Sequence, residues 1–187
     1  TLFRSQAPPG RPCEFHAGRI AHAKPHETAR SGREPGIGRG VSHAPVVLPW
    51  IETITITALG EIGVNATAFI LDARNALTPQ DALFFQRTAQ ILARYHLTVA
   101  PLRELRIEGG RTVGVDKDGK VIFPVAFDFA IWGDRAARRA DEFTALRKAK
   151  PGITGLALWT DGRISRRLAD ELTKRGIGFK ERVLEGQ

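Results

Sequence analysis

Residues 154–184, TGLALWTDGRISRRLADELTKRGIGFKERVL, contain a complete strand–helix–strand pattern. The apolar run TGLALW predicts a buried strand over residues 154–159. Ser165 is a favourable N-cap for a helix over 166–175, and Gly176 is placed to close that helix. IGFKERVL follows and predicts the last strand. Strands joined by a helix in this way are typical of parallel neighbours in one sheet.

A similar unit lies immediately upstream. VAFDFAIW at 125–132 is almost continuously apolar, which predicts a central strand. A helix is predicted over 135–149, and Pro151-Gly152 ends the unit. With the two downstream strands, this segment forms a βαβαβ unit whose crossovers are expected to be right-handed.

Two strands and one helix are predicted nearer the N-terminus. IETITIT at 51–57 alternates and is rich in β-branched residues, so it predicts a strand, and NATAFIL at 65–71 predicts a second one. Thr78 is a good N-cap and is followed by proline at the first helical position. An amphipathic helix is therefore expected over 79–95.

The segment between that helix and the βαβαβ unit predicts β-structure. LTVAPLRELRIE, residues 97–108, predicts a strand that Pro101 interrupts. RTVGVDKDGKVIFPV predicts a hairpin around the turn at residues 116–119. The expected fold class is therefore α/β, with α+β as the alternative. We expect one mixed sheet, with N-terminal hairpins and the C-terminal βαβαβ unit.

Residues 1–45 differ from the rest of the chain because Pro and Gly recur in them and aliphatic residues are sparse. Such a segment cannot bury enough apolar surface to offset its ordering entropy, so we expect a disordered tail. TLFRS, residues 1–5, matches the translation of ACGCTCTTCCGATCT, the end of a sequencing adapter. We therefore interpret residues 1–45 as a sequencing or translation artefact and residues 46–187 as a single domain.

The net charge of +8 is shared equally between two unequal parts of the chain. Residues 1–48 hold seven Lys and Arg against three Asp and Glu, and residues 49–187 hold 21 against 17. The domain is therefore only mildly basic. No apolar run approaches the roughly 18 residues that a membrane span needs, so we expect a soluble, cytoplasmic protein without a membrane partner.

Three of the expected strands are followed by an Asp with an Arg one or two places further on. These pairs are Asp72 with Arg74, Asp134 with Arg135, and Asp161 with Arg163. Parallel strands end at one edge of a sheet, where open α/β folds bind their ligands, so the six residues form a candidate binding site. Capping of backbone N–H groups and surface pairing is the alternative interpretation.

Trp132 and Trp159 occupy matching positions in two similar segments, AIWGD and ALWTD. Each follows an apolar run at the end of an expected strand. The two rings are candidates for a ligand platform, or else for packing at the rim of the core.

Several chemistries are excluded from residue 46 onward. This part holds no Cys, one His (His96) and one Ser (Ser165), so a Cys nucleophile and a Cys or multi-His zinc site are ruled out there. It also contains no phosphate-binding loop and no dinucleotide fingerprint.

The leading hypothesis is a small non-catalytic domain that needs no cofactor. It would bind a protein partner or a small ligand at the edge carrying the Asp–Arg pairs. One alternative is a magnesium-dependent, phosphate-processing enzyme that uses the three aspartates. A second alternative is weak nucleic-acid binding through two arginine pairs, Arg138, Arg139, Arg166 and Arg167.

Overall fold

The computed structural model describes residues 49–185, and the expected tail at residues 1–45 lies outside this range. The helices and strands follow one another as α1 (Pro49–Ile62), α2 (Thr67–Ala73), α3 (Pro79–Thr98), β1 (Leu102–Glu108), β2 (Arg111–Asp116), β3 (Lys120–Val125), β4 (Phe129–Ala130), α4 (Asp134–Ala149), β5 (Gly155–Thr160), β6 (Arg163–Ile164), α5 (Arg166–Lys174) and β7 (Ile177–Lys180). Within this range, no helix is both long enough and apolar enough to cross a bilayer.

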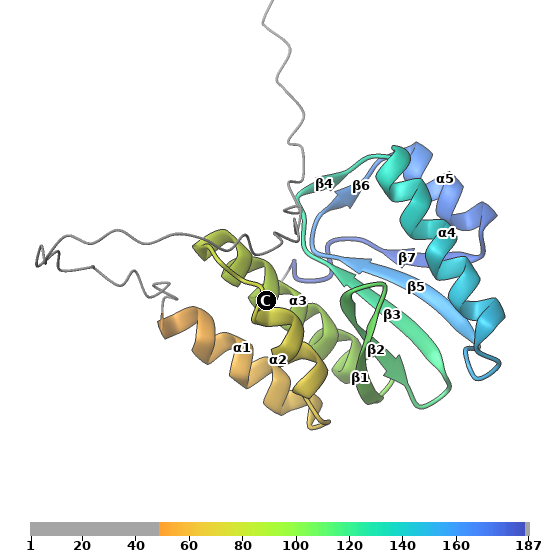
Figure 1. The fold of residues 1–187 in the computed structure, drawn as a ribbon. Helices are drawn as coiled ribbons and strands as arrows, with labels where there is room; N and C mark the ends of the chain where they lie inside the picture. Colours follow the sequence, from red (N-terminus) through yellow and green to blue (C-terminus); the bar gives the residue numbers. More distant parts are fainter. Residues whose placement is uncertain (1–48, 186–187) are drawn as a thin grey trace, which may run out of the picture. The chain divides into compact units, whose positions relative to one another are not determined.

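A five-stranded mixed sheet forms the centre of the domain, as the sequence predicts. Its strand order is β1-β2-β3-β5-β7. The first three strands pair antiparallel, whereas β3, β5 and β7 pair in parallel. The expected C-terminal βαβαβ unit is confirmed, although its first strand is β3. A separate pair of two-residue strands, β4 and β6, runs parallel beside the ends of α4 and α5 (Figure 1).

Helices cover both faces of the sheet (Figure 1). The face toward α1, α2 and α3 receives Ile122 from β3 and Trp159 from β5. The opposite face, toward α4 and α5, receives Phe123 and Leu158 from the same two strands. Because successive side chains of a strand point to opposite faces, each central strand contributes to two apolar layers.

The prediction of a strand at 51–57 is wrong, because these residues lie in α1. Its buried residues Ile51, Ala58 and Ile62 recur at helical spacing. Ala58 and Ile62 join the core cluster that contains the buried residues of α3. The threonine hydroxyls fit a helix as well, since Thr55 Oγ1 donates to the Ile51 carbonyl at 2.7 Å. β-Branched residues favour strands only weakly, and packing against a neighbouring helix overrides that preference.

The prediction of a strand at 65–71 is also wrong, because α2 occupies this segment. Phe69 and Asp72, three residues apart, are buried on one side of the helix, whereas Ile70 and Leu71 are exposed. The apolar run therefore does not lie inside a sheet. Only one side of α2 packs on the core.

The prediction of a central strand over residues 125–132 is wrong as well. The strand in the sheet is β3, which ends at Val125, and the chain then forms a loop and the two-residue strand β4. The predicted hairpin is confirmed, and Gly119 in its turn has a φ of 82°. Because β3 already fills the place between β2 and β5, the apolar residues after it lie outside the five-stranded sheet.

The expected helix after Thr78 is confirmed and extends to Thr98. The Thr78 hydroxyl accepts the backbone N–H of Asp81 at 3.1 Å, and the Asp81 carboxylate accepts the N–H of Thr78 at 3.0 Å. Burial tends to raise the pKa of Asp81, but the hydrogen bonds from Thr78 and Leu77 outweigh it and lower that pKa. This reciprocal capping sets where α3 begins.

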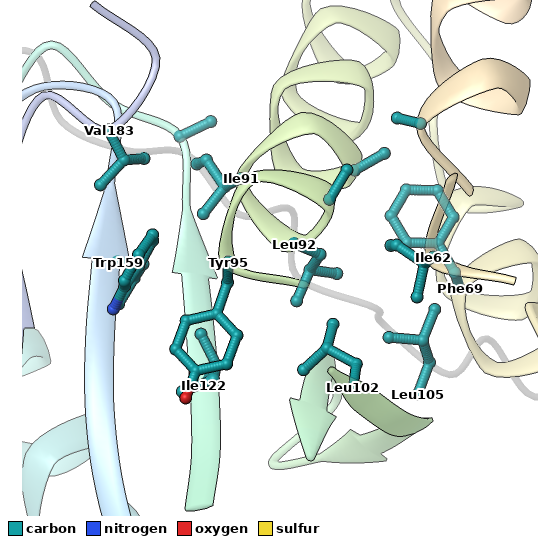
Figure 2. Close-up of a cluster of buried hydrophobic side chains, with 14 of the residues drawn as sticks. Ile62, Phe69, Ile91, Leu92, Tyr95, Leu102, Leu105, Ile122, Trp159 and Val183 are labelled. Carbon is teal, nitrogen blue, oxygen red and sulfur yellow. The ribbon is translucent and has the colours of Figure 1, made fainter. Parts of the chain in front are cut away.

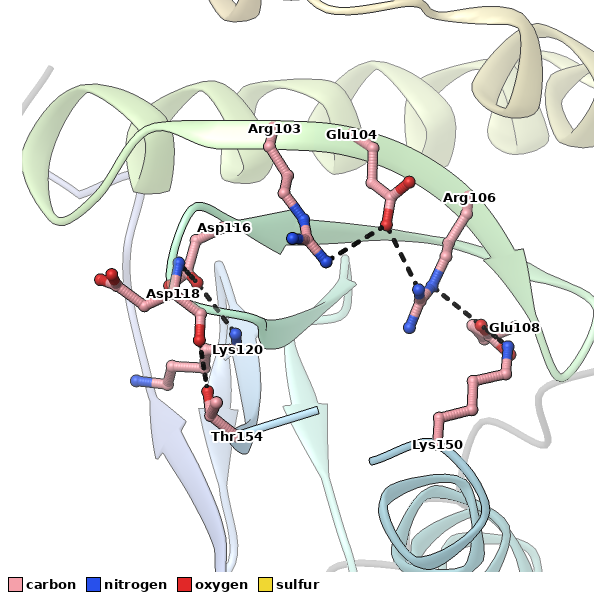
Figure 3. A network of polar contacts seen from close by, with 9 residues as sticks. All are labelled: Arg103, Glu104, Arg106, Glu108, Asp116, Asp118, Lys120, Lys150 and Thr154. Atoms are coloured by element: carbon pink, nitrogen blue, oxygen red, sulfur yellow. Dashed lines mark hydrogen bonds and ion pairs between the residues drawn. The ribbon is translucent and has the colours of Figure 1, made fainter. Parts of the chain in front are cut away.

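Tyr95 of α3 connects the core to the hairpin. Its ring meets Trp159 edge-to-face, with centroids 4.9 Å apart (Figure 2). Its hydroxyl donates to Asp116 Oδ2 at 2.7 Å. Asp116 Oδ1 in turn accepts the backbone N–H groups of Asp118 and Lys120 at 2.9 Å each (Figure 3). Asp116 is therefore hydrogen-bonded both to α3 and to the backbone of the hairpin turn.

We predict that Thr78→Ala destabilises the domain by about 1 kcal/mol, because it removes the N-cap acceptor of α3. Thr57→Ala is the control, since Thr57 is exposed within α1 and alanine favours a helix interior. Urea unfolding measures both variants. Equal midpoints for Thr78→Ala and the wild type would contradict the assigned cap.

We predict that Tyr95→Phe lowers the free energy of unfolding by about 1–3 kcal/mol, because the buried Asp116 carboxylate loses a hydrogen-bond donor. Burial, then the hydrogen bond with Asp116, raises the pKa of Tyr95 above its ordinary value of 10.0. The hydroxyl therefore contributes fully below pH 10, and this contribution is lost as the pH rises through the folded-state pKa. Unfolding at pH 7 and at pH 11 should show a smaller difference at the higher pH.

Candidate functional site

The carboxyl ends of β3, β5 and β7 lie at one edge of the sheet because these strands are parallel. The chain leaves β3 toward β4 and leaves β5 toward β6. Phe129 pairs with Arg163 and Ala130 with Ile164, so the two exit segments form their own short sheet. Residues 126–132 and 161–165 are called the carboxyl edge below.

Asp161 anchors the carboxyl edge to the rest of the domain. Its Oδ1 accepts the backbone N–H of Phe127 at 3.0 Å, and its Oδ2 accepts Nη1 of Arg87 at 3.2 Å. Only 9% of its side chain is exposed. Arg87, on α3, also approaches Asp128 Oδ1 at 3.5 Å. Both oxygens of Asp161 therefore serve protein groups, which join β5, the exit from β3, and α3.

Backbone contacts complete this anchoring. Arg163 N–H donates to the Asp128 carbonyl at 2.9 Å, and Ser165 N–H donates to that of Ala130 at 2.8 Å. Gly162 lies so close to the other segment that an added Cβ would be 1.9 Å from the Phe127 carbonyl oxygen. The Glu181 carboxylate, just after β7, accepts the N–H of Ile164. The carboxyl edge is thus fixed from several directions.

Asp72 belongs to α2 and not to the end of a strand, which corrects the expectation from the sequence. It is buried within α2, and its Oδ2 accepts Thr112 N–H at 2.8 Å and Thr112 Oγ1 at 3.0 Å. Arg111 Nη1 lies 3.8 Å from its Oδ1. Asp72 therefore fastens α2 to β2, and Arg74 is exposed at the C-cap of α2.

The other two predicted pairs do belong to this end of the domain. Asp134 and Arg135 begin α4 just after β4 and are exposed, while Asp161 and Arg163 lie in the carboxyl edge itself. Nowhere in residues 49–185 do three or more Asp, Glu, His or Cys side chains form a group that could hold a metal ion. The magnesium alternative therefore lacks the set of three aspartates on which it depended.

The two predicted tryptophans occupy different environments. Trp159 is buried in β5, where Tyr95 covers one part of the ring and Lys180 Nζ lies 4.8 Å from its centroid. Trp132 is half-buried after β4, and the Arg175 guanidinium lies 4.7 Å from its centroid. Both rings are thus in contact with protein side chains.

Two exposed apolar residues in the carboxyl edge were missed by the sequence interpretation. Phe129 is 60% exposed and Ile131 is 58% exposed, although both fall in the segment predicted as a buried strand. Phe129 lies in β4 and Ile131 directly follows its last residue, so both exposed side chains belong to the exit from β3. Asp128, which interrupts the apolar run, was the available signal that this segment reaches solvent.

Positive charge is concentrated in the segment that contains α4 and α5. Residues 131–176 hold 11 Lys and Arg against 6 Asp and Glu, while all other residues of 49–185 hold 10 against 11. Arg138, Arg166 and Arg167 are exposed and form no side-chain hydrogen bond or ion pair with any described residue. Arg139, by contrast, donates to the Gly109 carbonyl at 2.7 Å and pairs with Glu142.

Two surface hollows lie elsewhere on the domain. One, of about 240 Å³, lies between α1 and α3 beside Ala58 and Leu97. The other, of about 340 Å³, lies between Gly109 and α4, beside Phe143 and Leu146. Neither is lined by a residue of the carboxyl edge.

Comparison of the chain with protein-family models, with curated proteins and with solved structures found no match.

We predict that Gly162→Ala separates the two segments of the carboxyl edge, because its Cβ cannot fit beside the Phe127 carbonyl. Hydrogen exchange at the amides of Arg163 and Ser165 should become faster. Gly152→Ala is the matched control, since no atom lies within 4 Å of its added Cβ. Unchanged protection in Gly162→Ala would contradict the close approach described here.

Proposed function

We propose that this is a non-catalytic domain that binds a partner through its carboxyl edge, with Phe129 and Ile131 as the apolar contacts. The observation that carries the proposal is the exposure of these two large side chains on a backbone that is otherwise firmly held. Aromatic and large aliphatic residues supply much of the binding free energy in interfaces when a partner buries them.

The way the backbone is held supports binding without a large rearrangement. The Asp161 carboxylate joins the β3 exit to α3 through Phe127 N–H and Arg87, and the Ser165 N–H joins β6 to β4. Little conformational freedom would then be lost in this backbone when a partner binds. The exposed side chains of Phe129 and Ile131 suit contact with an extended partner.

The local roles of polar side chains support a non-catalytic function. Ser165 Oγ accepts the N–H of Leu168 and caps α5, and His96 Nδ1 accepts the N–H of Leu102. Both oxygens of Asp161 are also occupied by protein donors. These three side chains, each of which could act as a nucleophile or base, are thus used to hold secondary structure.

We predict that Phe129→Ala/Ile131→Ala weakens binding to a cellular partner at least tenfold without lowering the stability of the domain. Immobilised domain would be exposed to a cell extract, and the captured protein or nucleic acid would be identified, purified and titrated against each variant. Ile70→Ala/Leu71→Ala on α2 is the control, because these side chains are 56% and 48% exposed.

The expected result is a Kd that rises at least tenfold for the Phe129/Ile131 variant and stays unchanged for the α2 variant. Equal affinity of the captured molecule for the wild type and both variants would show that the carboxyl edge is not the binding surface.

A further inference from the structure

We propose that the partner of the carboxyl edge is single-stranded nucleic acid, a deepening that rests on the proposed function. Exposed arginines around the carboxyl edge would contact its phosphates, and the ring of Phe129 would stack on a base. The sequence alone placed nucleic acid last among the alternatives. The exposure of Phe129, which the sequence interpretation missed, changes that order.

Arginines outnumber carboxylates around the carboxyl edge. Residues 126–139 and 161–167 hold six Arg, no Lys and three Asp. Asp161 is already paired with Arg87, and Asp128 also approaches that guanidinium. Asp134 is exposed and is the one carboxylate in these segments without an ion pair to another described residue. The surroundings of the carboxyl edge therefore favour an anionic partner.

The basic residues around the carboxyl edge are all arginines. Arg138, Arg166 and Arg167 are exposed beside the carboxyl edge and are unpaired within residues 49–185. A guanidinium is planar and can donate two parallel hydrogen bonds to a phosphate. The arginines of β1 are different, because Arg103 and Arg106 form ion pairs with Glu104 and Glu108 (Figure 3). Unpaired arginines are thus available near β4 and β6, whereas the arginines of β1 are neutralised by neighbouring glutamates.

Phe129 lies on the short sheet that β4 and β6 form. It is in register with Arg163 on the neighbouring strand, so both side chains project from the same face of the short sheet, and both are exposed. Proteins that bind single strands combine an aromatic stacking surface with positive charge along the backbone path. A duplex hides the faces of its bases, and an acidic polypeptide has no base to stack, so a single strand uses both features best.

The test is fluorescence anisotropy with labelled dT20 and U20, using residues 46–187 and the full chain at 50 and 200 mM NaCl. We expect binding that weakens with salt, with a slope of log K against log[salt] of about −3 for four phosphate contacts. Phe129→Leu should weaken binding about 5- to 150-fold, the equivalent of one lost base stack. Arg166→Gln/Arg167→Gln should weaken binding and flatten the salt slope by about 1.4.

The control variant, Arg94→Gln/Arg103→Gln, also removes two positive charges, but at positions outside the carboxyl edge. Its salt slope and affinity should stay near those of the wild type. Circular dichroism would confirm that each variant is folded. Binding of either oligonucleotide that Phe129→Leu and Arg166→Gln/Arg167→Gln leave unchanged would overturn the proposal.

The remaining outcomes separate this proposal from the proposed function. If neither oligonucleotide binds at 50 mM NaCl but the captured partner still requires Phe129 and Ile131, the nucleic-acid proposal is wrong and the binding function stands. Binding of poly-glutamate in place of both oligonucleotides would have the same meaning. If no molecule binds in a way that depends on the carboxyl edge, both proposals are wrong.

Discussion

Three parallel strands, β3, β5 and β7, require apolar cover on both of their faces, and this requirement organises the domain. Phe123 and Leu158 face α4 and α5, while Ile122 and Trp159 face α3. Because α3 lies on that second face, its own outer side needs cover, and α1 and α2 provide it (Figure 2). The crossovers that carry α4 and α5 then leave β3 and β5 at the same end, so the carboxyl edge is a consequence of covering the strands.

The sequence predicts local structure best at helix caps and tight turns, where the requirements of one backbone position select the residue. The caps Thr78 and Ser165 and the turn at Gly119 were predictable because few residue types satisfy those positions. The segments that became α1 and α2 were not, since Ile and Thr fit both periods and the neighbouring helix α3 decided between them. Periodicity within one segment contains no information about that neighbour.

Two aspartates show how far the candidate binding residues were predictable. Asp72 and Asp161 both follow apolar runs, and both are largely buried with their oxygens occupied by backbone or side-chain donors. One fastens a helix to β2 and the other fastens a loop to β5, so the same local pattern serves two different connections. Their partners, Thr112 and Arg87, are 40 and 74 residues away in sequence, and nothing in the local pattern indicates them.

The unequal charge of the two helical layers has a consequence for how the domain meets other molecules. Residues 49–98, which form α1 to α3, hold three Lys and Arg against four Asp and Glu, whereas residues 131–176 hold 11 against 6. The domain therefore has an electric dipole moment directed from one layer toward the other. In the field of a charged surface, such a molecule rotates before it touches, so that α4 and α5 turn toward an anionic body and encounters are oriented before contact forms.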